Sequence, residues 1–415
     1  MSQFERVVVT GLGAMTPLGV GVEKFWQGIK CASNGIGPIT LIDVSKHTTR
    51  FGGEVTGFNP EDFVERKEAR RMDRFVQLSV AASDEAIKGS GLVIADNNRD
   101  RVGVVIGCGV GGLQTWEREY RTLIEKGPDR VSPFLIPMMI SNMAAGHVSI
   151  RHGARGPNTA TVSACTTSAH AIGFAYDLVR RGDADAMIAG GAEAPICDSA
   201  LAGFGNMHAL SRRNDDPAHA SRPFDKERDG FVMGEGAGTV LLESLSSAQA
   251  RGAKIYAELL GYGMSADAYH ITGMPEEGYG LGNAMKAALR YSGVQPEEVQ
   301  YINAHGTSTP TNDKTETAAI KQVFGEHAYK MGVSSTKSQV GHLLGAGSAV
   351  EFIATALGLY HQIMPSTINH QVPDPECDLD YVTEGARAAK FDVALTNSSG
   401  FGGHNVSLAL RRWAE

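Results

Sequence analysis

The chain has 415 residues, of which 42% are hydrophobic and 20% are charged, so it can bury a large core and hold two lobes of similar size. Its formal charge of -8 argues against a general nucleic-acid binder, whose surface is usually basic. Five cysteines without CxxC spacing argue against a disulfide framework or a metal site, and no apolar run reaches the roughly 18 residues of a membrane span, so we expect a cytoplasmic protein.

Short apolar strands followed by glycines are predicted in the first part of the chain. They cover Arg6 to Thr10, Arg101 to Gly112, Ala184 to Glu193 and Gly238 to Glu243. The first runs into GlyLeuGly, a turn that can hold a phosphate, but the third glycine of a dinucleotide-binding turn is missing and Pro17 interrupts the helix that should follow. Helices are expected over Phe25 to Ile29 and within residues 59 to 91.

The same order of strands and glycines starts again at Lys254. Its strands begin near Lys254, Val299, Met331, Phe391 and Asn405. This repetition predicts a duplicated α/β unit with halves 1–253 and 254–415, in which helices cover a mixed or parallel sheet. In such sheets functional residues gather where strands end and helices begin, so we expect them at the junction of the halves.

Cys165 stands where a strand pattern turns into a helix. Thr161 and Val162 continue a β-branched run, whereas apolar residues recur at helical intervals from Ser168 to Arg180. The helix macrodipole and unpaired backbone N–H groups favour a thiolate at such a position. A small buried core residue is the alternative for a lone cysteine, and this stretch alone leaves the two interpretations equal.

His305 and His342 follow strand patterns in the second half and lie beside Gly306 and Gly341. Any single histidine is more often a surface or core residue than a catalyst. If the halves face each other through corresponding turns, however, both imidazoles approach Cys165. One cysteine and two histidines suit acyl transfer through a thioester, with the imidazoles stabilising an enolate formed when carbon dioxide leaves a malonyl-type unit.

Several long motifs in order resemble the β-ketoacyl-acyl-carrier-protein synthases of the Cys-His-His type, and the chain looks most like synthase II of type II fatty-acid synthesis. The motifs occupy residues 7–13, 163–168, 222–236, 303–309, 337–346 and 400–405. The resemblance implies the thiolase fold, an α/β architecture of five αβαβα layers from two pseudo-duplicated halves. It also implies a homodimer that condenses acyl and malonyl groups carried by acyl carrier protein. No metal or organic cofactor is implied, because the pantetheine arm arrives on the carrier.

The resemblance assigns roles to the residues that match the family's motifs. Cys165 accepts the acyl chain, and His305 and His342 bind the malonyl thioester and support decarboxylation. Lys337 and Glu351 match a supporting pair that can orient the histidines and hold their protonation states. For this pair, a salt bridge on a helix surface is the alternative.

Further matches concern the pocket. The backbone N–H groups of Cys165 and Phe401 match the oxyanion hole, and the glycines around Phe401, Gly402 among them, would let its ring swing aside as a gate. Core packing is the alternative for this ring. The resemblance assigns Thr307 and Thr309 to the pantetheine arm, and Cys108 to the acyl pocket near the dimer partner, where its small side chain predicts medium to long acyl chains.

A basic cluster of the first half also gains a role. Arg66, Lys67, Arg70, Arg71 and Arg74 form, on composition alone, a solvated helix face. Within the family, Lys67, Arg70 and Arg71 match the positive patch that docks the acidic carrier protein, with Arg130 as an addition. His208 stands where relatives often carry arginine.

Two other functions fit parts of the same pattern. A type II polyketide ketosynthase shares the Cys-His-His set and differs in its pocket and partners. A non-catalytic chain-length partner keeps the fold, but such proteins usually lack the nucleophile, whereas this chain has all three residues.

Overall fold

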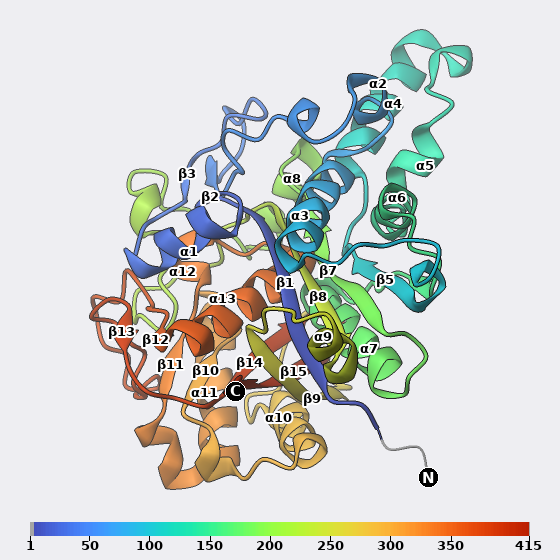
Figure 1. Cartoon of the computed structure of the whole chain (residues 1–415). Coiled ribbons are helices and arrows are strands. Elements are labelled where there is room, and N and C mark those ends of the chain that lie inside the picture. The colour runs from blue at the N-terminus through green and yellow to red at the C-terminus, as the bar shows by residue number, and fades with distance from the viewer. Residues whose placement is uncertain (1–3, 415) are drawn as a thin grey trace.

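The computed structural model describes residues 4–414, which form two copies of one five-stranded pattern (Figure 1). The first copy contains β1 (Val7–Thr16), β5 (Val102–Gly107), β6 (Asn158–Thr159), β7 (Ala186–Glu193) and β8 (Gly236–Ser244). The second contains β9 (Ala257–Ala266), β10 (Tyr301–Asn303), β11 (Gly332–Ser334), β14 (Val393–Gly400) and β15 (His404–Arg412). Both copies order their strands, numbered along the chain, as third, second, fourth, fifth, first. The predicted duplication is therefore present.

Pairing directions also agree between the two halves. In each, the two pairings made by the second strand are parallel and the other two are antiparallel. The halves meet where β1 pairs antiparallel with β9 over Val7–Val9, so the two expected sheets are joined along one short edge. The prediction of a mixed sheet is confirmed.

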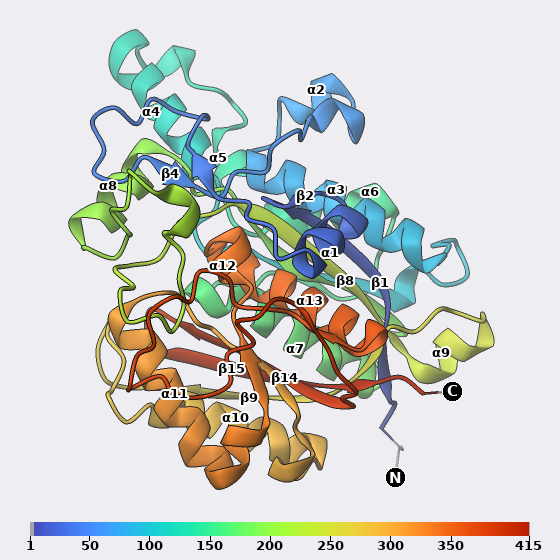
Figure 2. The same ribbon diagram turned by 90° about the vertical axis from the view of Figure 1, so that its left-hand side faces the viewer.

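Helices separate and cover the two sheets as five layers (Figure 2). α3 (Arg74–Ser90) and α6 (Met143–His152) cover the outer face of the first sheet. α7 (Thr167–Arg180) and α13 (Gly347–His361) lie between the sheets, and α10 (Tyr279–Ser292) and α11 (Pro310–Phe324) cover the outer face of the second. This is the αβαβα arrangement of the thiolase fold.

The central helix α13 is apolar on nearly all sides, and protein surrounds it. Every residue from Gly347 to Leu359 is buried, including Glu351. A helix that is hydrophobic all round belongs inside a protein, and the one carboxylate among these residues needs a buried partner. α13 therefore carries a charged group into the layer where the two halves meet.

The remaining helices and short strands lie around this framework. The helices are α1 (Val22–Lys30), α2 (Arg66–Ala69), α4 (Leu113–Lys126), α5 (Leu135–Met139), α8 (Asp198–Asn206), α9 (Leu245–Ala250) and α12 (Lys337–Val340). The strands are β2 (Gly19–Val20), β3 (Gly37–Pro38), β4 (Phe51–Gly52), β12 (Ile363–Met364) and β13 (Arg387–Ala388). No helix within residues 4–414 has the length and apolar character of a membrane span.

The predicted glycine turn after the first strand is wrong. β1 continues through GlyLeuGly to Thr16, because these glycines make room for α3. A Cβ atom on Gly11 would lie 2.3 Å from the Ala86 carbonyl oxygen, and one on Gly13 would lie 1.8 Å from that of Ala82. The glycines therefore serve close helix–strand packing.

Candidate active site

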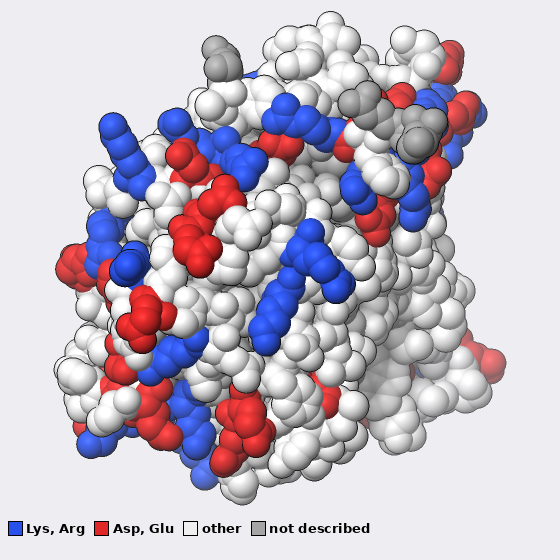
Figure 3. Space-filling view, turned by 90° about the horizontal axis from the view of Figure 1, so that it is seen from below, with Lys and Arg blue, Asp and Glu red and all other residues white. Residues whose placement is uncertain are grey.

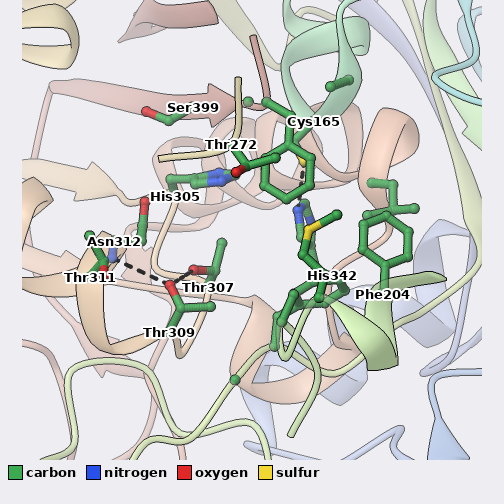
Figure 4. Close-up of a pocket in the computed structure, with 18 of the residues that line it drawn as sticks. Cys165, Phe204, Thr272, His305, Thr307, Thr309, Thr311, Asn312, His342 and Ser399 are labelled. Atoms are coloured by element: carbon green, nitrogen blue, oxygen red, sulfur yellow. Dashed lines mark hydrogen bonds between the residues drawn. The ribbon is translucent and has the colours of Figure 1, made fainter. Parts of the chain in front are cut away.

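Cys165 lies in a tight turn of the first half, at the N-terminal end of α7 (Figure 4). A 3₁₀ turn, Ala164–Thr166, leads into the helix, and Ala164 has a φ of 51°, a left-handed conformation that a non-glycine residue rarely adopts. Ser348 Oγ of α13 donates a hydrogen bond to the Cys165 carbonyl at 2.9 Å. The turn and the neighbouring half thus fix the direction of the thiol.

The structure brings both predicted histidines to this cysteine. His342 Nε2 lies 3.0 Å from Cys165 Sγ, and the centroids of the His305 and His342 rings lie 5.4 Å apart. His305 follows β10 and His342 follows α12, so both come from the second half. Figure 4 shows the three side chains at one cavity. The expected convergence of the two halves is therefore observed.

Lys337 and Glu351 form an ion pair behind the histidines. Their side chains are 2% and 3% exposed, and Lys337 Nζ also lies 3.4 Å from His305 Nδ1. A surface salt bridge, the alternative interpretation, is therefore wrong. The pair places one positive charge inside the site and neutralises it with a carboxylate that α13 carries.

Burial sets the charge state of the reacting groups. It raises the pKa of the Cys165 thiol to about 12, although the Lys337 charge lowers it. Burial and Lys337 together hold the pKa of His305 and of His342 well below 6.5. The expected thiolate is thus wrong for the resting site, because desolvation outweighs the helix N-terminus. A neutral thiol faces a neutral imidazole.

The segment around Phe401 closes against the nucleophile turn. A Cβ atom on Gly400 would lie 3.1 Å from the Cys165 backbone nitrogen, so the two backbones are in close contact. The Phe401 backbone N–H faces the thiol and lowers its pKa. Gly402 and Gly403 have φ values of 87° and 74°. The half-buried Phe401 ring packs 6.3 Å from Phe204, between centroids.

A cavity of about 500 Å³ joins these groups. Its lining includes the nucleophile and both histidines, the aromatic rings of Phe204, Phe231 and Phe401, and hydroxyl groups of Thr272, Thr307, Thr309, Thr311 and Ser399. Thr307 Oγ1 and Thr309 Oγ1 lie 2.9 Å apart in the same wall. The cavity combines an apolar part with a polar wall that can bind an amide chain. Gly402 is outside this lining, next to Phe401 in the chain.

Cys108 does not line this cavity, although the resemblance assigns it to the acyl pocket near the dimer partner. Its side chain is buried in the core and donates from Sγ to Glu193 Oε1 at 2.9 Å, whereas its neighbours Gly109 and Val110 line the cavity. The thiol turns inward because the Glu193 carboxylate attracts its proton. In this chain alone, Cys108 is therefore not part of the cavity wall.

Three buried carboxyl groups near the site were missed at the sequence level. Glu193 accepts hydrogen bonds from the backbone N–H groups of Gly109, Val110 and Gly345. Glu316 accepts from the backbone N–H groups of His305 and Gly306, and burial raises its pKa to about 7. Asp313 accepts in the same way from Phe224 and Ser308. Such carboxylates fix the loops that carry the reacting groups. A charged residue within an apolar or glycine-rich pattern, as Glu193 has, is the signal that could have revealed them.

The predicted docking residues lie on the surface. Lys67, Arg70, Arg71 and Arg130 are exposed. The Arg71 guanidinium lies 4.6 Å from the centroid of the Phe134 ring. Arg74 points inward instead and forms an ion pair with Glu235 at 2.6 Å, so it does not belong to the solvated face. His208, at the cavity, lies 2.7 Å from Arg212 through its Nδ1.

No group of three or more His, Cys, Asp or Glu side chains within residues 4–414 is arranged to hold a metal ion. All five cysteines in this part of the chain are free thiols.

Comparisons with known proteins point to one family over most of the chain. Its two models, "Beta-ketoacyl synthase, N-terminal domain" and "Beta-ketoacyl synthase, C-terminal domain", match residues 4–248 and 256–371. The chain is 57% identical over 409 residues to a 3-oxoacyl-[acyl-carrier-protein] synthase 2 of Synechocystis sp., covering 99% of this chain and 98% of the relative. It is 53% identical over 413 residues to the protein of the same description from Staphylococcus aureus, covering 100% of both.

Solved structures agree with the sequence relatives. A β-ketoacyl synthase of Burkholderia phymatum matches with a TM-score of 0.91 and 36% identity, over 99% of this chain and 100% of that chain. A ketosynthase–acyl-carrier-protein complex of a type II polyketide synthase, with a bound hexaketide, matches with a TM-score of 0.92 and 35% identity, over 99% and 100% of the chains.

Proposed function

Because the chain belongs to the β-ketoacyl synthase family, we propose that Cys165, His305 and His342 condense an acyl group with a malonyl group, both carried by acyl carrier protein. The enzyme is an acyltransferase that elongates fatty acids by this reaction. One observation carries the residue assignment: Cys165 Sγ lies 3.0 Å from His342 Nε2, in a cavity that His305 also lines.

The first step transfers the acyl chain to the enzyme. His342 takes the proton of the Cys165 thiol while the sulfur attacks the thioester carbonyl carbon of the acyl carrier. A neutral imidazole at 3.0 Å can do this, whereas a protonated one cannot. The N–H groups of Cys165 and Phe401 stabilise the oxyanion, and the carrier thiol leaves with the proton that His342 returns.

The second step prepares the carbon nucleophile. The malonyl thioester carbonyl lies against His305 and His342, which donate hydrogen bonds as neutral imidazoles. For this step His342 carries its proton on Nε2, so the proton that Nδ1 holds while Nε2 accepts from the thiol is exchanged through solvent between the two steps. The bond to the malonyl carboxylate breaks, carbon dioxide leaves, and the electron pair forms an enolate that these hydrogen bonds stabilise. Low imidazole pKa values favour this arrangement, because the histidines remain neutral donors across the physiological pH range.

The third step forms the new carbon–carbon bond. The enolate carbon attacks the acyl-thioester carbon on Cys165, the carbon–sulfur bond breaks, and a 3-oxoacyl chain remains on the carrier. The released Cys165 thiolate takes a proton from solvent, which restores the neutral resting thiol. Phe401 admits the acyl chain in the first step and closes for the third, since glycines flank it on both sides.

Acyl carrier protein docks on a local basic patch in this proposal. Lys67, Arg70 and Arg71 are exposed on and just after α2, at the opposite end of the molecule from the face in Figure 3, where acidic and basic side chains are intermingled. Opposite charge speeds association and falls off with salt. Lys67→Glu and Arg70→Glu should each raise the KM for the carrier protein without lowering kcat. Arg290→Glu on α10 is the control and should leave this KM unchanged. Equal effects of all three variants would refute the docking site.

We also propose that the enzyme is a cytoplasmic homodimer without a bound cofactor. β6 leaves one open edge at the end of the first sheet, and the exposed side chains of Val110, Ile136 and Val162 belong to neighbouring segments. Open strand edges and apolar patches require cover. Val162→Glu should shift the sedimentation of the protein toward a monomer, and an unchanged dimer would contradict this surface.

A polyketide ketosynthase is the second candidate, since solved relatives include that class. The identities of 57% and 53% to proteins described as 3-oxoacyl-[acyl-carrier-protein] synthase 2 favour fatty-acid elongation, because the polyketide ketosynthase is only 35% identical to this chain. A chain-length partner without activity is disfavoured because the nucleophile and both histidines are present and in contact.

Cys165→Ala tests the proposed reaction directly. It should abolish acyl-enzyme formation and condensation with acyl and malonyl carrier protein, whereas Cys31→Ala, which alters an exposed thiol, should retain both. Condensation by Cys165→Ala would refute the assignment. Product lengths in an acyl-carrier series would separate fatty-acid from polyketide elongation.

A further inference from the structure

His170, on the first turns of α7, touches the turn that carries the nucleophile without reaching the cavity. Its Nδ1 lies 2.7 Å from Ser163 Oγ and 3.3 Å from Thr166 Oγ1. These two residues flank Cys165 on either side. Neither the reaction steps above nor the family motifs assign a task to this histidine.

The backbone it holds is strained. Ala164, between Ser163 and Cys165, has a φ of 51°, which persists only when surrounding contacts determine it. Thr166 Oγ1 donates to the Ser163 carbonyl at 2.7 Å, and Thr167 Oγ1 accepts from the Ser163 N–H at 2.9 Å. Ser163 is therefore held through its N–H and its carbonyl from within the turn, and its hydroxyl is held from outside the turn, by His170.

The same imidazole faces the Phe401 segment. The His170 ring meets the His404 ring edge-on at 6.1 Å between centroids, and a Cβ on Gly402 would lie 3.1 Å from the His404 ring. Gly400 presses on the nucleophile turn, as described above. His170 thus contacts the nucleophile turn on one side and the residue that follows the Phe401 glycines on the other.

The charge state of His170 suits a permanent contact with Ser163. Burial lowers the pKa of His170 to about 4, with a further contribution from His404. The ring is therefore neutral at physiological pH, and its Nδ1 stays available to the Ser163 hydroxyl.

We propose that His170 is a positioning residue for Cys165: through Ser163 it holds the left-handed Ala164 turn, which aims the thiol at His342 and at the carbonyl it attacks. This role deepens the proposed function and rests on it. It requires that loss of the contact slow attack by the thiol, and that it leave malonyl decarboxylation, which uses only His305 and His342, unchanged.

Three substitutions test this role. His170→Phe keeps an aromatic ring but removes the hydrogen bond, His170→Asn places an amide where Nδ1 was, and Ser163→Ala removes the other partner. His170→Phe and Ser163→Ala should each slow single-turnover acyl-enzyme formation about tenfold or more, because small misplacements of a reacting atom cost that much. The double variant His170→Phe/Ser163→Ala should form the acyl-enzyme no more slowly than the slower of the two single variants. His170→Asn should recover most of the wild-type rate.

Two readouts separate positioning from general damage. The decarboxylation rate of malonyl carrier protein and the midpoint of thermal unfolding should stay close to wild type in His170→Phe. Parallel loss of acylation and decarboxylation would overturn the proposal, as would acylation within twofold of wild type. Alkylation of Cys165 by iodoacetamide needs no carrier protein, so a changed alkylation rate in His170→Phe supports the contact even if the wild type fails to condense, and an unchanged rate refutes it.

Discussion

Lys337→Met removes the one positive charge buried behind the histidines. Lys337 and Glu351 are 2% and 3% exposed, so the variant leaves a carboxylate without its partner in the interior. Breaking a buried pair in this way costs about 3–5 kcal/mol. We therefore expect urea unfolding to show a free energy lower by that amount, reduced to the extent that Glu351 binds a proton.

The same substitution changes the pH dependence of acylation. Burial and the Lys337 charge hold the pKa of His342 well below 6.5, so the wild-type imidazole is still neutral at pH 6.5. Without the ammonium the pKa rises, and His342 becomes protonated at a higher pH. Because a protonated His342 cannot accept the thiol proton, single-turnover acylation by the variant should fall at a higher pH than in wild type.

Lys337→Met/Glu351→Leu is the matched control, because it removes both charges. It should unfold at a higher urea concentration than Lys337→Met alone, since an apolar pair of similar volume replaces a buried ion pair at little cost. Its acylation rate should nevertheless fall at the same raised pH as in Lys337→Met, because it also lacks the ammonium group. This account of the pair would be refuted by a double variant that is no more stable than the single one. It would also be refuted if acylation by Lys337→Met fell at the same pH as acylation by the wild type.

Other predictions concern the thiol, a packed glycine and a buried carboxylate. Because the pKa of Cys165 is about 12, its alkylation rate should still rise above about pH 10, where an ordinary thiol with a pKa near 9 levels off. A plateau at or below about pH 10, after subtraction of the Cys165→Ala background, would contradict this. Gly13→Ala should destabilise by about 1–3 kcal/mol or more, because its Cβ would meet the Ala82 carbonyl, whereas Gly89→Ala in α3, with no atom within 4 Å of the new Cβ, should stabilise by about 0.5–1 kcal/mol. Effects of the same sign in urea unfolding would contradict the packing argument. Glu193→Gln should lower the unfolding free energy by about 1–3 kcal/mol, since both carboxylate oxygens accept backbone N–H groups and one becomes a donor; an unchanged unfolding curve would show that these bonds add nothing.

The repeat could be predicted because it depends only on the order of strands and glycines along the chain. Each half carries the same succession of apolar strands and glycines, and strands in the same succession formed the same lateral order twice. The extent of β1 could not be predicted in this way. The sequence GlyLeuGly is compatible with both a turn and a strand, and only the close approach of α3 to Gly11 and Gly13 decides between the two. The division into 1–253 and 254–415 stays a prediction, because α7 and α13 of the two halves share the layer between the sheets.

The site was predictable where a residue follows a strand, as His305 does, or where the family resemblance marks a residue, as it does Lys337 and Glu351. Glu193 and Glu316 escaped because their role lies in binding backbone N–H groups, which no side-chain pattern reveals; for Glu193 these groups also belong to loops distant in sequence. Cys108 does not line the cavity of this chain, although its place in the acyl pocket near a dimer partner stays a prediction. Its environment depends on the direction of one side chain, and the carboxylate that sets this direction comes from a different strand.

The resting charge of Cys165 shows why local reasoning fails at such a position. A helix N-terminus stabilises an anion by about 0.3–1 kcal/mol at exposed sites, whereas one unit of pKa corresponds to about 1.4 kcal/mol. Burial raises the pKa of the thiol from 9.0 to about 12, a shift of about three units, and so exceeds that stabilisation several times over. The nucleophile is consequently made by proton transfer to His342 during the attack. Any change that moves Sγ away from Nε2 should therefore lower the acylation rate more than a change that only alters the surrounding field, and the Ser163–His170 contact is placed to control that distance.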